Sequence, residues 1–406
     1  MSLNRRLVLG MLVGAAGLVA ASFAEAAEPV KIGMTASSQG RFALAAQSGE
    51  RGLKIWIDDV NSRGGVDVGG EKHKIELVTL DDRSDKAMVP RVYETLIKEE
   101  NVDILFGPFG STLTGAAANT TEQFGKFLMI WSASSDAIYE QGYKYVVSGS
   151  QIAASRLGHP SVKALKAMGV NSIAFAYLDE PFPAGITKGA ADLAKELGVE
   201  IAMMEKFAKG TKDFSLIIQK ALASGADAFY PTSYEGDQMI IARQLRELGA
   251  NFPATYMVYA SQPQFLEIDQ DALYLVSQTL LHDKINWDVN AGLNRAQMME
   301  RYNKLFPNVA YQADFQTALA YSAGAVLEEI IKKAGSLEPA KLKQAALDLN
   351  EKLVVMTGPY KIEDTGKQVS MEFVIMQNMK GGPEVVYPPA IATAKPAYPA
   401  PAYSTR

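Results

Sequence analysis

Hydroxyl side chains gather in two short segments, "GPFGSTLT" from Gly107 and "WSASSD" from Trp131. The residues of interest are Ser111, Thr112 and Thr114 in the first segment, and Ser132, Ala133, Ser134 and Ser135 in the second. Each segment follows a short apolar run and precedes residues that can begin a helix. A hydroxyl at a helix start can cap the helix by accepting from its free amides. The same hydroxyls and amides can instead bind the carboxylate of a small ligand. Both interpretations fit the sequence.

Residues typical of catalysis or metal binding are sparse. No Lys follows the glycines of the first segment, so it is not a Walker loop, nor is it a G-x-S-x-G nucleophile elbow. The three histidines, His73, His159 and His282, show no metal-binding spacing, and the chain has no cysteine. We therefore expect no enzyme activity, no metal and no cofactor. A secreted hydrolase that uses Ser111 is the competing hypothesis, which turnover of ester substrates would support.

Apolar runs that read as strands alternate with amphipathic runs that read as helices, which predicts βαβ units and parallel sheets. The expected strands are Val30–Thr35, Ile75–Leu80, Val102–Phe106, Leu128–Trp131, Ser172–Leu178, Val199–Glu205 and Ala226–Tyr230. The expected helices are Ser48–Arg63, 89–97, Ala184–Leu197, Phe214–Ser224 and Asp237–Leu248. Because the pattern restarts near residue 172, we predict an α/β protein with two doubly wound parallel-sheet lobes. A helical stretch should follow from Arg295 through Lys333 and again from Pro339, with late strands at Val354–Tyr360 and Met371–Met376.

Ligands of open parallel sheets bind beyond the carboxyl ends of the strands. Both hydroxyl segments fall there, and so do "ASSQGRFA" with Arg41 and Phe42, "DEPFP" with Phe182, and "PTSYEGD". In the last of these, Tyr234 and Glu235 could be a solvated helix start or part of a ligand clamp.

The first 26 residues have the features of a secretory signal peptide. Arg5 and Arg6 precede an apolar run, and Ala24-Glu25-Ala26 forms an A-x-A cleavage site. Export by the Sec route is favoured over the twin-arginine route, and the expected location is the periplasm.

The chain of 406 residues carries a net charge of −5 without a basic patch, so nucleic acid is not expected as a partner. Residues 388–406 are rich in Pro, Ala and Tyr, which predicts a tail that is disordered or draped over the surface.

Taken together, these segments resemble the periplasmic substrate-binding proteins of ABC transporters, type I, in the leucine/isoleucine/valine-binding family. The resemblance spans residues 30–377. It is carried by "KIGMTASSQGRFA", "GLKIWIDDVNSRGG", "LVTLDDRSD", "GPFGSTLT", "MIWSASSD", "KGTKDFS", "GADAFYPTSYEGDQMIIARQLRELG", "FQTALAYSAGAVLEEIIKKAGS" and "LVVMTGPYKIEDTGKQ".

The resemblance implies two lobes joined by three crossing segments near Ser148, Gln278 and Met356. Lobe 1 would comprise residues 30–148 plus 279–356, and lobe 2 residues 149–278 plus 357–387, with the tail at 388–406. A monomeric receptor would close on a small polar ligand, an amino acid or related carboxylate, and deliver it to an ABC permease. The alternatives are a periplasmic sensor on the same fold and a binder of non-amino organic acids, for example aromatic ones.

The resemblance also implies roles for individual residues. Positions matching Ser111, Ala133 and Ser135 hold the α-carboxylate and ammonium of an amino acid, and Tyr234 and Phe182 match aromatic positions. The family's acidic residue for the ammonium falls near Ala260 or Ser261, and its first-loop tyrosine near Ala45. Glu235 or Asp179 could supply the missing carboxylate, and Phe42 the missing ring. Arg41 could instead pair with the carboxylate of an organic acid that has no amine.

Overall fold

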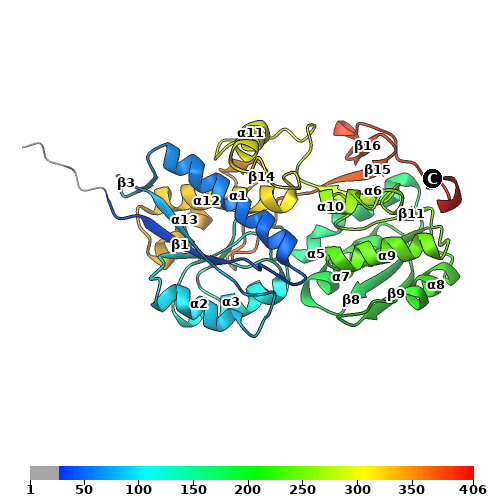
Figure 1. Ribbon diagram of the computed structural model, residues 1–406, viewed down its shortest axis with the longest axis horizontal. Coiled ribbons are helices and arrows are strands. Elements are labelled where there is room, and N and C mark those ends of the chain that lie inside the picture. The colour runs from blue at the N-terminus through cyan, green and yellow to red at the C-terminus, as the bar shows by residue number, and fades with distance from the viewer. Residues whose placement is uncertain (1–26) are drawn as a thin grey trace, which may run out of the picture.

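Two α/β lobes lie side by side along the long axis of the molecule (Figure 1). The computed structural model describes residues 27–406, so the predicted signal peptide, residues 1–26, lies outside the described part. In the first lobe, five parallel strands are ordered β4-β1-β5-β6-β7. Their bounds are β1 Val30–Thr35, β4 Ile75–Leu80, β5 Ile104–Phe106, β6 Leu128–Ile130 and β7 Val146–Ser148. The predicted α/β class with doubly wound parallel sheets is confirmed.

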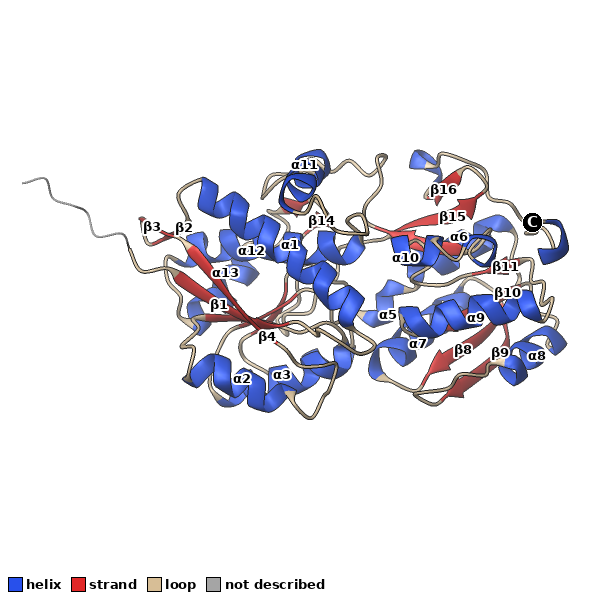
Figure 2. Ribbon diagram, in the orientation of Figure 1, coloured by secondary structure: helices blue, strands red, loops and turns tan. Residues whose placement is uncertain are grey.

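Helices cover both faces of the first sheet (Figure 2). Helices α1 (Ala43–Ser62) and α12 (Phe315–Ala334) lie on one side, and α2 (Val89–Lys98) and α3 (Ser111–Gln123) on the other. α1 and α12 approach closely because glycines stand at their contact. A Cβ added to Gly52 would lie 2.3 Å from the Thr317 carbonyl oxygen, and one added to Gly324 would lie 2.4 Å from the Trp56 ring. The contact requires the absence of those side chains.

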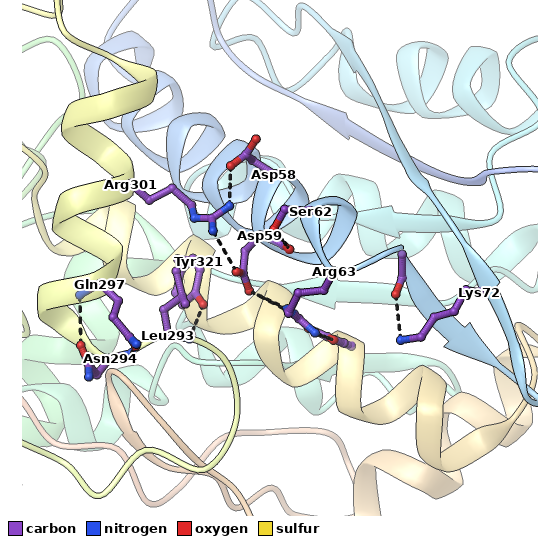
Figure 3. A network of polar contacts seen from close by, with 12 residues as sticks. Asp58, Asp59, Ser62, Arg63, Lys72, Leu293, Asn294, Gln297, Arg301 and Tyr321 are labelled. Atoms are coloured by element: carbon purple, nitrogen blue, oxygen red, sulfur yellow. Dashed lines mark hydrogen bonds and ion pairs between the residues drawn. The ribbon is translucent and has the colours of Figure 1, made fainter.

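Ion pairs join α1 to α11 (Arg295–Leu305) at the rim of the first lobe (Figure 3). Arg301 contacts the carboxylates of both Asp58 and Asp59, and Arg63 lies 3.0 Å from the second of them. α11 begins with a capping box in which Asn294 accepts from the Gln297 amide at 3.0 Å. These contacts fix α11 against the lobe although only two of its residues are buried.

In the second lobe, four parallel strands are ordered β11-β10-β8-β9. The strands are β8 Ser172–Leu178, β9 Glu200–Phe207, β10 Ala228–Thr232 and β11 Ala254–Thr255, and the helices are α5 Ala154–Leu157, α6 His159–Met168, α7 Pro181–Glu196, α8 Ser215–Ala223 and α9 Glu235–Glu247. A parallel bridge between Tyr256 and Val276 continues this sheet into an antiparallel one, ordered β12-β15-β16. Its strands are β12 Val276–Thr279, β15 Val374–Met379 and β16 Gly382–Tyr387. The sheet of the second lobe is therefore extended by three antiparallel strands, of which the sequence pattern predicted only β15.

Several predicted boundaries were wrong for local reasons. The helical stretch from Arg295 is interrupted, because Pro307 stands where the helix would continue. A new helix, α12, begins after Asp314, whose side chain caps it by accepting from the Thr317 amide at 2.9 Å. The predicted strand Val354–Tyr360 is a hairpin of β13 (Val354–Val355) and β14 (Gly358–Pro359). The strand predicted at Met371–Met376 is β15 and begins three residues later. The elements absent from the prediction are β2 Val66–Val68, β3 Glu71–His73, α4 Asp136–Tyr139, β7, α5, α6, β11, α10 Pro263–Leu266, β12 and β16. Helix α13 starts as expected and spans Pro339–Asp348.

The C-terminal tail is draped over the second lobe. The Gln377 side chain bonds both the amide and the carbonyl of Ala397, at 2.8 and 3.1 Å. The Arg406 guanidinium donates to the Leu273 carbonyl at 2.8 Å and lies 3.6 Å from the centre of the Tyr403 ring. Of the two expectations for this segment, the draped one holds. Within residues 27–406, no helix combines the length and the apolar character needed to cross a membrane.

The contact between α1 and α12 gives a stability prediction. Gly324→Ala should lower the free energy of unfolding by about 1–3 kcal/mol, because the new methyl group overlaps the buried Trp56 ring. Gly115→Ala in α3 is the matched control, since no atom lies within 4 Å of its added Cβ, and it should raise stability by about 0.5–1 kcal/mol through helix propensity. Urea denaturation measures both. Equal stabilisation by the two substitutions would contradict the packing account.

Candidate ligand-binding site between the lobes

The loops at the carboxyl ends of the two parallel sheets face each other across the junction of the lobes. From the first lobe come the loops after β1, β5 and β6, and from the second those after β8 and β10. The predicted site residues in the first lobe are Arg41, Phe42, Ser111, Thr112, Ala133, Ser134 and Ser135, and those in the second are Phe182, Tyr234 and Glu235. Contacts between the two groups show that the lobes touch here.

The hydroxyl groups of the first lobe connect two neighbouring loops. Ser111 Oγ accepts hydrogen bonds from the amides of Ser134 and Ser135, at 3.2 and 3.0 Å. Ser132 Oγ accepts from the Gly110 amide at 3.2 Å, so the loops are joined twice. Helix α3 has Gly110 at its N-cap and no side-chain cap. The N-cap interpretation of these hydroxyls is therefore wrong.

The start of α3 presents unoccupied donors. Among the described residues, no acceptor lies within hydrogen-bond reach of the amides of Ser111, Thr112 and Leu113. Gly110 precedes them with φ of 84°, a conformation that glycine adopts without strain. Nearby, Ser134 Oγ is fully buried and has no partner within the described chain, whereas Ala133 is buried and contributes only its carbonyl, 3.4 Å from the Tyr139 hydroxyl. This part of the site can donate several hydrogen bonds to an anion.

Four aromatic rings close the junction. Phe42 and Phe109 come from the first lobe, and Phe182 and Tyr234 from the second. The Tyr234 ring centre lies 4.8 Å from that of Phe42, 5.4 Å from Phe182 and 6.4 Å from Phe109. Edge-to-face and tilted pairs at these separations attract one another. All four rings are buried, so a ligand reaches this place only when the lobes separate.

An ion pair crosses the junction beside the rings. Arg41 Nη2 lies 2.6 Å from both carboxylate oxygens of Glu180, and its guanidinium stacks 4.4 Å from the Phe42 ring and 4.9 Å from the Tyr234 ring. Thr112 Oγ1 lies 3.4 Å from the same carboxylate. The sequence makes the Arg41 guanidinium a candidate ligand anchor. In the structure it is paired with Glu180 of the opposite lobe, and this ion pair joins the two lobes.

Glu235 begins α9, and although its side chain is half-buried, one oxygen of its carboxyl is buried without a partner. Oε1 is inaccessible to solvent and makes no hydrogen bond within the described chain. Burial first, and the negative charge of the Asp314 carboxyl second, raise the pKa of Glu235 to about 8. Asp314 caps α12 in the first lobe, and burial raises its pKa as well. The negative charge of an acidic group of the first lobe therefore acts on the Glu235 carboxyl of the second.

Sequence reasoning missed Asp314. An Asp before "FQTALA" is a common N-cap signature, and that role explains the residue without any ligand. Asp314 also raises the pKa of Glu235, and the sequence gives no sign of this effect because the two residues are far apart in it. Asp179, the other candidate acid, pairs with Lys206 at 2.8 Å and is half exposed. Ala260 is buried, and Ser261 donates to the Gln278 carbonyl at 2.6 Å, so neither position supplies a charge.

Little space lies between the lobes. Beside the rings, a small cavity of about 20 Å³ has room for a single water molecule. Phe109, Phe182, Tyr259 and Gln316 are among its walls. Outside the rings, an open groove of about 790 Å³ passes Thr112 and Glu180. No group of three or more possible metal ligands occurs within residues 27–406.

Two α/β lobes with polar and aromatic groups meeting at their junction define a binding protein of the clamshell type. Residues 29–383 match the profile of the periplasmic binding protein family, and the chain belongs to this family.

Individual relatives agree with this assignment. The chain is 27% identical over 401 residues to the Leu/Ile/Val-binding protein homolog 7 of Brucella abortus (strain 2308), covering 92% of this chain and 95% of the relative. Its fold is similar to that of a leucine-binding protein from Thermotoga maritima, with a TM-score of 0.75, 23% identity and coverage of 88% and 97% of the two chains. A solute-binding protein from R. palustris in complex with benzoate is similar at a TM-score of 0.75, 16% identity and coverage of 92% and 98%.

The buried carboxyl predicts a pH-dependent stability. In the unfolded chain Glu235 titrates near 4.5, and in the closed protein near 8, so the folded protein holds an extra proton between these values and loses stability as the pH rises through them. Glu235→Gln should therefore stabilise the protein more at about pH 9 than at about pH 5, by about 1–3 kcal/mol, less than the full shift because opening re-exposes the carboxylate.

Thermal unfolding at both pH values measures this difference. The matched control is Asp237→Asn, since that carboxylate lies on the same turn and accepts from Ser233 Oγ at 2.6 Å. A pH-independent effect of Glu235→Gln would show that this carboxyl is not buried in solution.

The ion pair across the junction predicts a shift in closure. Glu180→Gln should favour the open state by about 1 kcal/mol, or about fivefold, because Arg41 loses its charged partner. Asp179→Asn is the control, since it removes a pair of similar length that lies within one lobe. Fluorescence energy transfer between dyes on the two lobes reports the change. If both substitutions move the open fraction equally, Arg41 and Glu180 do not hold the lobes together.

Proposed function

We propose that the protein is an exported periplasmic receptor that captures a small polar solute by hinge closure and delivers it to an ABC permease. The observation that carries this proposal is that groups able to bind a small polar ligand come from opposite lobes and are buried at one place. The α3 amides and loop hydroxyls belong to the first lobe, and Tyr234 and Glu235 to the second. A ligand that contacts both groups stabilises the closed state more than the open one, and so shifts the population toward closure.

The ligand in this proposal is an amino acid or a related carboxylate. Its carboxylate binds the free amides at the start of α3, beside Ser111 and the unpartnered hydroxyl of Ser134. Its apolar part lies against Phe42, Phe182 and Tyr234. Leucine binding by a structural relative supports this ligand class.

An aromatic carboxylic acid is the second candidate ligand. The four rings at the junction favour it, since rings attract one another in edge-to-face geometry. The R. palustris relative is a complex with benzoate. Such a ligand would occupy the same amides and leave the Glu235 carboxyl without a partner.

The remaining parts of the proposal concern the whole chain. Residues 1–26 direct export and are removed, the mature protein is a monomer, and residues 30–148 plus 279–356 move as one lobe against 149–278 plus 357–387. The arrangement of the strands in separate sheets supports this division.

A sensor that reports to a receptor rather than a permease is distinguished by neighbouring genes, because a transporter requires permease and ATPase genes.

Native mass spectrometry of protein purified gently from its host tests the receptor function. A co-purified small molecule, whose removal increases the radius of gyration in small-angle scattering, is the expected result. An identical scattering curve with and without a saturating ligand would refute hinge closure.

Ser111→Ala should weaken binding of that molecule by about 1–3 kcal/mol, because the amides of Ser134 and Ser135 lose the oxygen that aligns them. Thr120→Ala is the control on the same helix, since its hydroxyl bonds only the Ala116 carbonyl. Calorimetry that finds equal affinities for both variants would remove Ser111 from the site.

A further inference from the structure

The loop that leads from β1 to α1 is held in place by the loop after β4. Asp82 is buried, and its carboxylate accepts from Thr35 Oγ1 at 2.6 Å and from Ser37 Oγ at 2.5 Å. Its neighbour Asp81 accepts from both the amide and the hydroxyl of Ser38, at 2.9 and 2.5 Å. The two carboxylates therefore fix the first half of the loop after β1.

Ser84 fixes the second half of the same loop. Its hydroxyl donates to the Gln39 carbonyl at 2.7 Å and accepts from the Phe42 amide at 3.2 Å. Gln39 and Phe42 stand on either side of Arg41 in the chain. A single hydroxyl group thus holds the backbone both before and after the arginine.

The backbone that presents this hydroxyl is strained. Arg83 and Ser84 have φ of 54° and 57°, in the left-handed region that residues with a Cβ seldom adopt. Such residues cost free energy and persist only where their surroundings impose the conformation. Here Asp81 accepts from the Arg83 amide at 2.8 Å, and Asp82 accepts from the Ser84 amide at 2.9 Å. The aspartates that hold the loop after β1 therefore also hold the strained turn.

The end of the held loop carries two side chains that meet the second lobe. The Phe42 ring centre lies 4.8 Å from that of Tyr234, and Arg41 Nη2 lies 2.6 Å from the Glu180 carboxylate. Both contacts depend on where the backbone of residues 39–42 lies. The hydrogen bonds of Ser84 stay within the first lobe, so Ser84 acts on the junction through this loop.

We propose that Ser84 is a positioning residue for closure, and that the strained turn serves to hold Arg41 and Phe42 where they meet the second lobe. The inference rests on the proposed receptor function and adds a residue that touches neither the second lobe's ion-pair partner nor its ring. A loop that had to be ordered at each closure would lose conformational entropy at that step. Ser84 removes this loss, because the loop already has the closed arrangement before the lobes meet.

Two substitutions of Ser84 separate positioning from stability. Ser84→Gly removes the hydroxyl, but glycine suits a positive φ, so the relief of strain should offset the lost hydrogen bonds in urea denaturation. Ser84→Ala removes the same hydroxyl and keeps the strain, so it should also be less stable. We expect both to lower the ratio of closed to open protein about threefold, because the loop is no longer held. Fluorescence energy transfer between dyes on the two lobes of the ligand-free protein measures this ratio.

The control is Ser62→Ala. This serine also lies in the first lobe, and its hydroxyl donates to a backbone carbonyl, that of Asp59, at 2.7 Å. Its loss should leave the closed-to-open ratio unchanged. A local measurement accompanies the ratio: exchange of the Phe42 amide hydrogen should quicken in both Ser84 variants, since that amide loses its acceptor.

A double substitution shows whether Ser84 acts through Arg41. In an Arg41→Ala background the ion pair across the junction is already lost, so Ser84→Gly should lower the ratio further by less than about twofold. A purely structural role of Ser84 would give the same effect in both backgrounds.

The outcomes separate this inference from the receptor function. An unchanged closed-to-open ratio in a folded Ser84→Gly protein, or an equal effect with and without Arg41, overturns the positioning role and leaves the receptor function standing. If the wild-type protein shows one transfer efficiency that its co-purified solute and its removal do not alter, hinge closure itself fails, and the inference with it.

Discussion

Burial of the Glu235 carboxyl between the lobes is the constraint on which the closed structure depends. With the lobes in contact, Oε1 is shielded from water and has no donor within the described chain, and the charge of Asp314 in the other lobe acts on the same carboxyl. A buried carboxylate oxygen without a donor costs about 1–3 kcal/mol, which is at least the contribution of about 1 kcal/mol expected from the Arg41–Glu180 pair. The ring contacts around Tyr234 offset part of this cost. Closure is therefore coupled to the binding of a proton by Glu235.

Contacts within each lobe hold the groups of each half of the site in place. In the first lobe, Ser111 and Ser132 join the loops after β5 and β6, and the glycine contacts between α1 and α12 fix the helix that Asp314 caps. In the second lobe, Glu235 lies on the first turn of α9, directly after a buried strand. Groups that are immobile within their lobes can discriminate ligands by charge and by distance, because they cannot relax toward a poor one.

Much of the fold followed from local patterns in the sequence. Alternating strands and helices predicted the α/β class, and the strand ends predicted which loops would meet, since the geometry of parallel sheets requires it. Short strands at sheet edges, such as β16, were not predicted because they show little alternation of apolar and polar residues. The site was less predictable, because it depends on residues that meet only across the junction. Arg41 was interpreted as a ligand anchor since nothing in the sequence places Glu180 beside it, and Asp314 was hidden by its capping role. For the hydroxyl of Ser111 the sequence left a helix cap and a ligand contact both open, and the structure shows that it accepts from the amides of a different loop.

The coupling between charge and closure is tested most directly by small-angle scattering of the ligand-free protein across the range from about pH 5 to about pH 9, with Glu235→Gln alongside. The account predicts that the wild-type radius of gyration is smaller at the acidic end, where Glu235 holds a proton, and increases as the pH rises. It also predicts that the Gln variant keeps one compact radius at every pH. A wild-type radius that does not change with pH, or a variant that expands as the wild type does, would contradict it.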